Sequence, residues 1–224
     1  MSGPLPGNGV PLPLAGRGTG HRPPNRFETL HVERDDWTGE DDPAPRTILL
    51  RDASRSIISR NRSPDVGFEV SLNPYRGCEH GCIYCYARPT HAYLGFSPGL
   101  DFETRIMVKE DAPELLRKAL ASPRWTPQTL VLSGVTDPYQ PVEKRLRITR
   151  RCLEVLAEAR HPVGIITKNH LVTRDVDLLA ELATHGAAAV VLSVTTLDRE
   201  LQKVLEPRTS TPRKRLLAIE TLAR

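Results

Sequence analysis

The sequence predicts an α/β fold in which parallel strands alternate with helices. From residue 66 onward, short apolar runs recur, and stretches with apolar residues at helical spacing separate them. The last run, residues 187–194, is apolar throughout, as expected for a parallel strand that is buried on both faces. Such alternation implies right-handed crossovers between neighbouring parallel strands.

The expected elements follow one another in a regular order. The expected strands are residues 68–72, 129–132, 163–167 and 187–194, and the expected helices are residues 83–94, 112–120, 146–159, 176–183 and 213–223. Cys152 shares a helix face with Ile148 and Val155, so we expect it to be a small core residue. In the last helix, Leu216, Leu217, Ile219 and Leu222 are available for packing.

The N-terminal part of the chain has a different composition. Twelve of residues 1–24 are Gly or Pro, and residues 1–25 are therefore expected to be a disordered leader. Residues 26–65 are rich in charge and carry few apolar anchors, which predicts a loosely structured arm on the main domain, residues 66–224.

Overall composition indicates a globular protein of a reducing compartment. A chain of 224 residues is long enough for one sizeable core, and its net charge of +4 permits nucleic acid as a partner without requiring it. No apolar run is long enough for a membrane span, and no secretory signal is recognisable. Three of the four cysteines lie in one short loop, which favours a cytoplasmic protein over a disulfide scaffold.

The most informative stretch is residues 72–88, LNPYRGCEHGCIYCYAR. Cys78, Cys82 and Cys85 have the spacing C-x3-C-x2-C, and Gly77 and Gly81 allow the backbone to turn tightly beside them. Thiols this close in the sequence indicate a metal ion or a cluster. Structural zinc takes four protein ligands, whereas three cysteines on a four-iron cube leave one iron open for another ligand.

A zinc site stays open as an alternative at this point. Its fourth ligand would be His80, His91 or Cys152. His80 and His91 are more often ordinary polar residues than ligands.

With Tyr84 before its last cysteine, the stretch resembles the C-x3-C-x-aromatic-C motif of the radical S-adenosylmethionine (SAM) superfamily. The resemblance implies that Cys78, Cys82 and Cys85 hold a [4Fe–4S] cluster whose open iron chelates SAM. Reduction by a donor such as flavodoxin or ferredoxin would then cleave SAM to a 5′-deoxyadenosyl radical that abstracts a hydrogen atom. The longer string NPYRGCEHGCIYCYAR is similar to the branch that contains spore photoproduct lyase, whose members are often labelled DNA repair photolyases.

The resemblance also implies a partial parallel (β/α) barrel of six units. Only four units are expected here, so the chain is expected to be truncated, a fragment of a longer enzyme. The strand at residues 187–194 would then lack its next neighbour and leave an edge open to association.

Four loops beyond the strand ends are expected to carry the site, and the resemblance implies their roles. Ser133, Gly134, Thr136 and Asp137 would face the amino group of SAM, although Asp137-Pro138 also suits a plain turn. The remaining expected cofactor contacts are Tyr84 at the adenine, Lys168 at the carboxylate, Ser193 and Thr195 at the ribose, and Arg208 at a carboxylate or phosphate. For Lys168 the alternative is a solvated side chain.

Other functions are kept as alternatives. Spore photoproduct lyase carries a hydrogen-donating cysteine in the loop after the second strand, and Val135 stands there, so its reaction is not expected here. Basic clusters at residues 144–151 and 213–215 leave nucleic acid open as a partner. The competing interpretations are a non-enzymatic iron–sulfur or zinc module and an inactive fragment.

Overall fold

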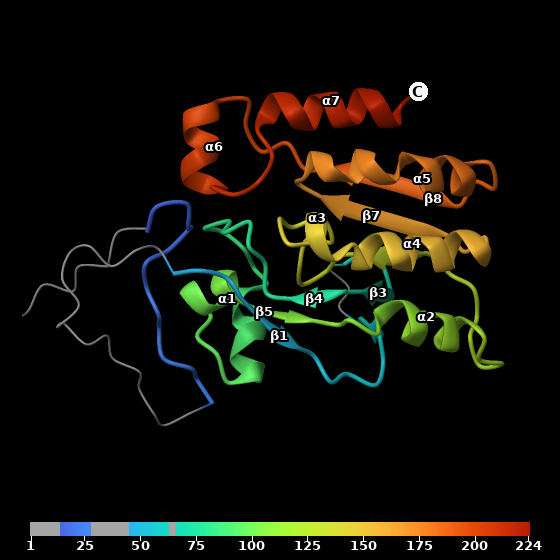
Figure 1. Ribbon diagram of the computed structural model, residues 1–224, viewed down its shortest axis with the longest axis horizontal. Coiled ribbons are helices and arrows are strands. Elements are labelled where there is room, and N and C mark those ends of the chain that lie inside the picture. The colour runs from blue at the N-terminus through green and yellow to red at the C-terminus, as the bar shows by residue number, and fades with distance from the viewer. Residues whose placement is uncertain (1–13, 28–44, 63–65) are drawn as a thin grey trace, which may run out of the picture.

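The computed structural model describes residues 14–27, 45–62 and 66–224 (Figure 1). Its main sheet has the strand order β2-β3-β6-β7-β8. These strands are β2 (Ile58–Arg60), β3 (Val70–Leu72), β6 (Leu130–Leu132), β7 (Val163–Thr167) and β8 (Ala188–Leu192). The four strands from β3 to β8 are parallel, and β2 is antiparallel to β3. The predicted α/β class and its four parallel strands are therefore confirmed.

The register of the parallel strands brings their carboxyl ends to one edge of the sheet. Leu72 of β3 is paired with Leu132 of β6, and Leu132 with Ile165 of β7. Thr167, the last residue of β7, is paired with Leu192, the last of β8. Loops that follow these strands consequently begin side by side.

A second, three-stranded sheet was not expected from the sequence. It has the order β1-β5-β4 and consists of β1 (Ile48–Arg51), β5 (Arg105–Val108) and β4 (Tyr75–Arg76). Its strands are two to four residues long, too short for a periodic pattern to reveal. Ile106 and Val108 of β5 are buried, so part of the predicted loose arm belongs to the packed structure through β1.

The helices cover the sheet and largely follow the expected order. They are η1 (Arg88–Leu94), α1 (Leu100–Thr104), α2 (Ala112–Leu120), α3 (Glu143–Leu146), α4 (Ile148–Glu158), η2 (His170–Asp175), α5 (Val176–Ala183), α6 (Arg199–Leu205) and α7 (Pro212–Leu222), where η marks a 3-10 helix. In Figure 1, α4 and α5 lie over one face of β7 and β8. No helix among the described residues is long and apolar enough to cross a membrane.

Two shifted helix starts and one additional helix have local reasons. The helix expected at residues 83–94 is a 3-10 helix from Arg88, because residues 83–87 still belong to the cysteine-bearing turn. The helix expected at residues 146–159 begins at Ile148, because Arg147 has a left-handed φ of 54° that separates α3 from α4. The unexpected α6 is capped by Asp198, whose carboxylate accepts from the amides of Glu200 and Leu201.

Two packing expectations were wrong. The strand at residues 187–194 was expected to be buried, but Val191 of β8 is 55% exposed, because exposure alternates along β8 and the face that carries Ala189 and Val191 is left uncovered. In α7, Leu216, Leu217 and Ile219 are exposed. The buried residues of α7 are Pro212, Arg215 and Ala218 instead, and of the four expected residues Leu222 packs against the main core.

Cys152 is fully buried in α4 and belongs to the main hydrophobic core, as predicted. The N-terminal segment departs from its prediction of disorder where the structure describes it. Arg17, Gly18 and Asn25 are buried, and Arg17 donates to the backbone carbonyl of Glu103 at 2.9 Å. The anchors Leu30, Val32 and Trp37 lie outside the described residues.

Candidate active site

Residues 77–87, here called the cysteine loop, follow β4 and turn sharply at two glycines. Gly77 has a φ of 81° and Gly81 a φ of 68°, a left-handed conformation that glycine adopts without strain. A Cβ atom on Gly77 would lie 2.8 Å from the carbonyl oxygen of Phe102, and one on Gly81 would lie 2.7 Å from Oε2 of Glu103. Both positions therefore require glycine, as the sequence indicated.

The loop directs its three cysteines to one cavity at the carboxyl edge of the main sheet, here called the cysteine cavity. Cys78, Cys82 and Cys85 are free thiols and line this space of about 160 Å³. Loops beyond β6, β7 and β8 form the rest of its wall, with Ser133, Gly134, Val135, Thr136, Asp137, Lys168 and Ser193. The structure thus brings together residues that lie more than a hundred positions apart in the sequence.

Burial keeps two of these thiols protonated in the absence of a metal. Burial, followed by the charge of Asp137, raises the pKa of Cys78. Burial, followed by the charge of Glu206, raises the pKa of Cys82 to about 12, although Lys168 acts in the opposite direction. Because thiolates are the metal-binding form, a positively charged metal centre would have to displace these protons.

The donor set fits an iron–sulfur cube better than a zinc ion. Cys152 lies in the core, and the ring of His91 packs against Phe102 and bonds the carbonyl of Arg105, so neither supplies a fourth ligand. No group of three or more His, Cys, Asp or Glu residues in the described parts of the chain is arranged to hold a metal ion. A cube takes each thiolate on a different iron, so its cysteines need not converge on one point.

His80 is the one histidine of the candidate zinc ligands that lines the cysteine cavity. It is fully enclosed, with Nε2 at 3.2 Å from Nδ2 of Asn169 and Nδ1 at 3.3 Å from Oδ2 of Asp137. Both ring nitrogens are therefore directed at protein groups.

Asp137 ties the loops beyond β6 and β7 together. Its carboxylate accepts from the backbone amides of Tyr139 and Lys168, each at 2.8 Å, and from the hydroxyl of Thr167 at 2.7 Å. Burial alone would raise the pKa of Asp137, but His80 and these hydrogen bonds outweigh it and lower the pKa. The hydrogen bond from the Tyr139 amide forms the turn that the sequence analysis gave as one alternative for Asp137-Pro138. The bonds from Thr167 and Lys168 also fix the wall of the cysteine cavity.

Gln140, to which the sequence analysis assigned no role, is hydrogen-bonded to the backbone of the cysteine loop. Its side chain is fully buried, accepts from the amide of Glu79 at 2.9 Å and donates to the carbonyl of Gly77 at 3.2 Å. The hydroxyl of Thr136 donates to the same carbonyl at 2.7 Å. The role of Gln140 could not be predicted from the sequence, because it depends on the loop after β6 lying next to the cysteine loop.

Three of the expected cofactor residues lie outside the lining of the cysteine cavity. Tyr84 is half exposed, and its hydroxyl donates to the carboxylate of Glu206. Thr195 lies near the same Tyr84–Glu206 pair. Arg208 turns to the opposite side of the loop and pairs with Glu79 at 3.2 Å.

Lys168 connects the cavity to this group. Its Nζ lies 5.9 Å from the ring centroid of Tyr84 and 3.9 Å from Oε1 of Glu206. Glu206 is completely buried and lies directly after the end of α6, and the sequence analysis assigned it no role.

Curated relatives cover most of the described fold. The chain is 41% identical over 175 residues to an uncharacterised protein of Mycobacterium tuberculosis, and the aligned region covers 78% of this chain and 51% of that protein. It is 30% identical over 174 residues to an uncharacterised protein of Methanocaldococcus jannaschii, covering 78% of this chain and 62% of that protein. The chain thus spans about half the length of the mycobacterial relative it matches.

Solved structures of spore photoproduct lyase have the same fold. The complex of that enzyme with dinucleoside spore photoproduct matches at a TM-score of 0.55 and 20% identity, over 78% of this chain and 47% of that chain. A mutant with bound AdoMet and dinucleoside spore photoproduct matches at a TM-score of 0.52 and 19% identity, with the same coverage. The fold is therefore the partial barrel that the cysteine motif led us to expect.

The model of the radical SAM superfamily matches residues 72–224, which contain the last residue of β3, the cysteine loop and the strands β6, β7 and β8. Together with the three cysteines that line one cavity at the carboxyl edge of the sheet, this match shows that the chain belongs to the radical SAM superfamily.

Proposed function

We propose that the protein is a radical SAM enzyme in which Cys78, Cys82 and Cys85 hold a [4Fe–4S] cluster. When bound, this cluster supplies the electron that cleaves SAM to methionine and a 5′-deoxyadenosyl radical, which abstracts hydrogen from a substrate of unassigned identity. The observation that carries the proposal is the convergence of three free cysteines and the polar ends of three strands on one cavity.

The residues of the wall have roles that follow from their chemistry. Lys168 offers a cation to the carboxylate of SAM, and Ser193 offers a hydroxyl at the end of the neighbouring strand. The backbone at Ser133-Gly134 lies against the cavity, and the carbonyl of Gly134 already accepts from the hydroxyl of Tyr86. Asp137 positions these loops through the hydrogen bonds that its carboxylate accepts.

We further propose that the reaction differs from that of spore photoproduct lyase. Val135 lines the cavity at the place where the resemblance implies a hydrogen-donating cysteine. A valine side chain has no S–H bond from which a product radical could take a hydrogen atom. The expected outcome is that a dinucleoside spore photoproduct is not repaired by this protein, whereas SAM is still cleaved.

Anaerobic reconstitution tests the proposal directly. The full chain is loaded with iron and sulfide, reduced with dithionite in the presence of SAM, and assayed for 5′-deoxyadenosine. Iron content near four per chain, a brown colour and 5′-deoxyadenosine formation would support it. A colourless, zinc-loaded protein that leaves SAM intact would contradict it. The triple variant Cys78→Ala/Cys82→Ala/Cys85→Ala is the matched control.

A further inference from the structure

A second cavity lies against the cysteine loop, and nearly all the charged side chains in its lining are basic. This space of about 860 Å³, here called the basic cavity, is lined by Arg17, Arg46, Lys144, Arg145 and Arg208, with Glu79 as the one carboxylate. The N-terminal segment, helix α3 and the segment after α6 thus bring together cations that are far apart in the sequence. Such a concentration of one sign of charge attracts an acidic partner.

The cysteine loop is the wall between the two cavities. Cys78 and His80 line the cysteine cavity, whereas Glu79 between them lines the basic cavity. Arg208 strengthens this wall from the basic side, since its backbone amide donates to the carbonyl of His80 at 3.2 Å. A group bound in the basic cavity therefore lies behind the cysteines and leaves the cysteine cavity free.

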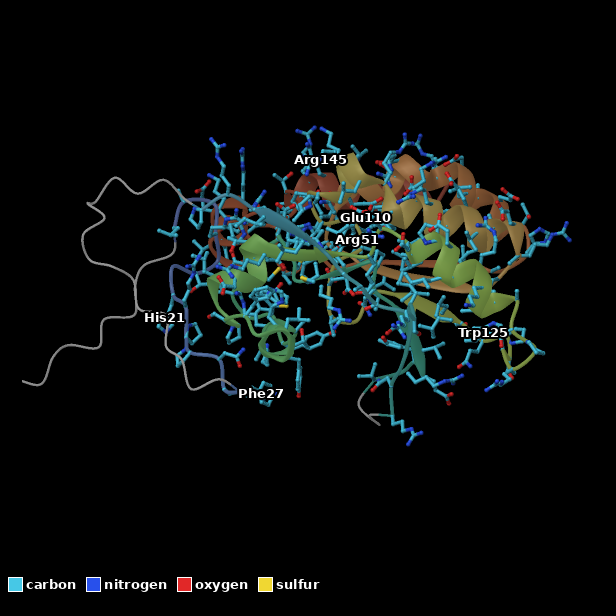
Figure 2. The ribbon with its side chains drawn as sticks, turned by 60° about the horizontal axis from the view of Figure 1, so that its bottom comes forward. His21, Phe27, Arg51, Glu110, Trp125 and Arg145 are labelled. Carbon is cyan, nitrogen blue, oxygen red and sulfur yellow. The ribbon has the colours of Figure 1, made fainter. Side chains whose placement is uncertain are left out.

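Three of the five cations are available to a partner. Arg46, Lys144 and Arg145 are exposed, and their side chains have no ion-pair partner within residues 14–27, 45–62 and 66–224. Figure 2 shows Arg145 at the molecular surface. The other two cations are engaged, because Arg208 pairs with Glu79 and Arg17 donates to Glu103, Pro45 and Thr47.

The pKa of Arg17 reflects the crowding of positive charge. Burial and, after it, the charge of Arg208 lower the pKa of Arg17. An acidic surface placed against the cavity would relieve this repulsion between cations.

We propose that the basic cavity is the docking surface of an acidic one-electron carrier protein. The inference rests on the proposed function, which needs a reductant for the centre held by Cys78, Cys82 and Cys85. A substrate has to enter the cysteine cavity, because hydrogen abstraction requires contact with the reacting atoms. Electron transfer requires no such contact, so a carrier can act from behind the loop. The carrier gives up one electron and the centre gains one, and no proton or group moves.

Surfaces of this kind are small and depend on charge. Electron-transfer encounters lie at the low end of interface sizes, and complementary charge mainly raises their association rate. Nucleic acid would also be attracted to cations. Glu79 lines the basic cavity and directly follows Cys78, so a partner in this cavity lies close to the cysteines. This short distance favours an electron carrier, because electron transfer depends on it and binding of nucleic acid does not.

Binding of a purified bacterial flavodoxin, an acidic FMN protein, tests the proposal without relying on enzyme activity. Its Kd is measured by calorimetry for the full chain and for Lys144→Glu/Arg145→Glu at low salt. The control is Lys118→Glu/Arg124→Glu, which reverses two exposed cations that do not line the basic cavity. Arg124 adjoins Trp125, which Figure 2 shows at a distance from Arg145.

The expected result is a Kd at least about tenfold higher for Lys144→Glu/Arg145→Glu, little change for the control, and a smaller difference at high salt. Reduction of the reconstituted protein by flavodoxin hydroquinone should slow in parallel, while reduction by dithionite should not. Equal Kd values for the two variants would overturn the proposal. The proposal would also be overturned if Lys144→Glu/Arg145→Glu lost binding to an oligonucleotide and kept binding to flavodoxin. That result would assign the basic cavity to nucleic acid. Failure of dithionite to yield 5′-deoxyadenosine would instead count against the proposed function.

Discussion

Arg215 and Glu206 form an ion pair that is closed off from solvent, with side chains that are 1% and 0% exposed. Arg215 lies in α7, and its guanidinium also donates to the carbonyls of Ser193 and Ser210, each at 2.8 Å. The second carboxylate oxygen of Glu206 accepts from the hydroxyl of Tyr84 in the cysteine loop. One buried pair therefore connects α7, the end of β8 and the cysteine loop.

Replacing Arg215 by alanine should destabilise the fold strongly. The change leaves the buried carboxylate of Glu206 with only the more distant Lys168, at 3.9 Å, and breaking one partner of a buried pair costs about 3–5 kcal/mol. Urea unfolding measures the effect, and Arg213→Ala, an exposed neighbour in the same helix, is the control. Equal unfolding midpoints for the two variants would show that the pair does not hold these segments together.

Single replacements of the cysteines should separate ligands from the core residue. Cys78→Ala, Cys82→Ala and Cys85→Ala should each lose most of the iron after anaerobic reconstitution. Cys152→Ala should keep the iron and lose only some stability, because Cys152 is enclosed in the core by α4. Iron counted per folded chain decides the matter, and retention of iron by Cys78→Ala together with its loss from Cys152→Ala would reverse the assignment.

Tyr84 should contribute to SAM affinity through its ring. Tyr84→Ala is expected to weaken SAM binding by about 1–3 kcal/mol, the size of a stacking contact with a base, with iron content preserved. Tyr84→Phe keeps the ring and removes only the hydroxyl bond to Glu206, so it should bind SAM more tightly than Tyr84→Ala. Unchanged affinity in both variants would return Tyr84 to a packing role.

Gly18→Ala should detach the N-terminal segment from the cysteine loop. A Cβ atom at Gly18 would lie 1.8 Å from the carbonyl oxygen of Gly81, which is backbone and has no room to move. We expect a loss of about 1–3 kcal/mol in unfolding free energy, typical of overpacking, and faster proteolysis near Arg17. Gly67→Ala is the matched control, because nothing lies within 4 Å of its added Cβ.

The free energy of unfolding should decrease as the pH is lowered, because the buried His91 has to be protonated. Burial lowers the pKa of His91 to about 4 from 6.5, so its contribution is fully present above pH 6.5 and is lost as the pH falls toward 4. Between pH 7 and pH 5 this one group should remove about 2 kcal/mol of unfolding free energy. His91→Phe keeps the ring between Phe96 and Phe102 and should remove this share of the pH dependence. An identical pH dependence in the variant would exclude His91 as its source.

The sequence predicted those parts of the fold whose signals are local. Strand β7 and helices α2 and α5 have the expected bounds, since each combines a clear apolar pattern with a nearby turn. The cysteine loop was recognisable from its spacing alone. The loops beyond β6, β7 and β8 could be placed at one edge because parallel strands end on the same side of a sheet.

What the sequence did not reveal depends on contacts between distant residues. The amide of Gly18 donates to Glu103 across 85 positions, and the amide of Glu79 donates to Gln140 across 61. Neither pair has a local pattern. Tyr84, Lys168 and Arg208 were each named as cofactor contacts, yet which of them meets Glu206 or Glu79 is decided by packing.

The hydrogen bonds between the cysteine loop and the segment after α6 set an order of assembly. Ile83 donates to the carbonyl of Leu205 at 3.0 Å, and His80 accepts from the amide of Arg208. During synthesis the three cysteines leave the ribosome more than a hundred residues before these partners do. Long-range contacts form late because loop closure has to precede them. A metal centre can therefore be enclosed in its final surroundings only after the chain has been made to about Arg208, and loading would follow translation of this segment.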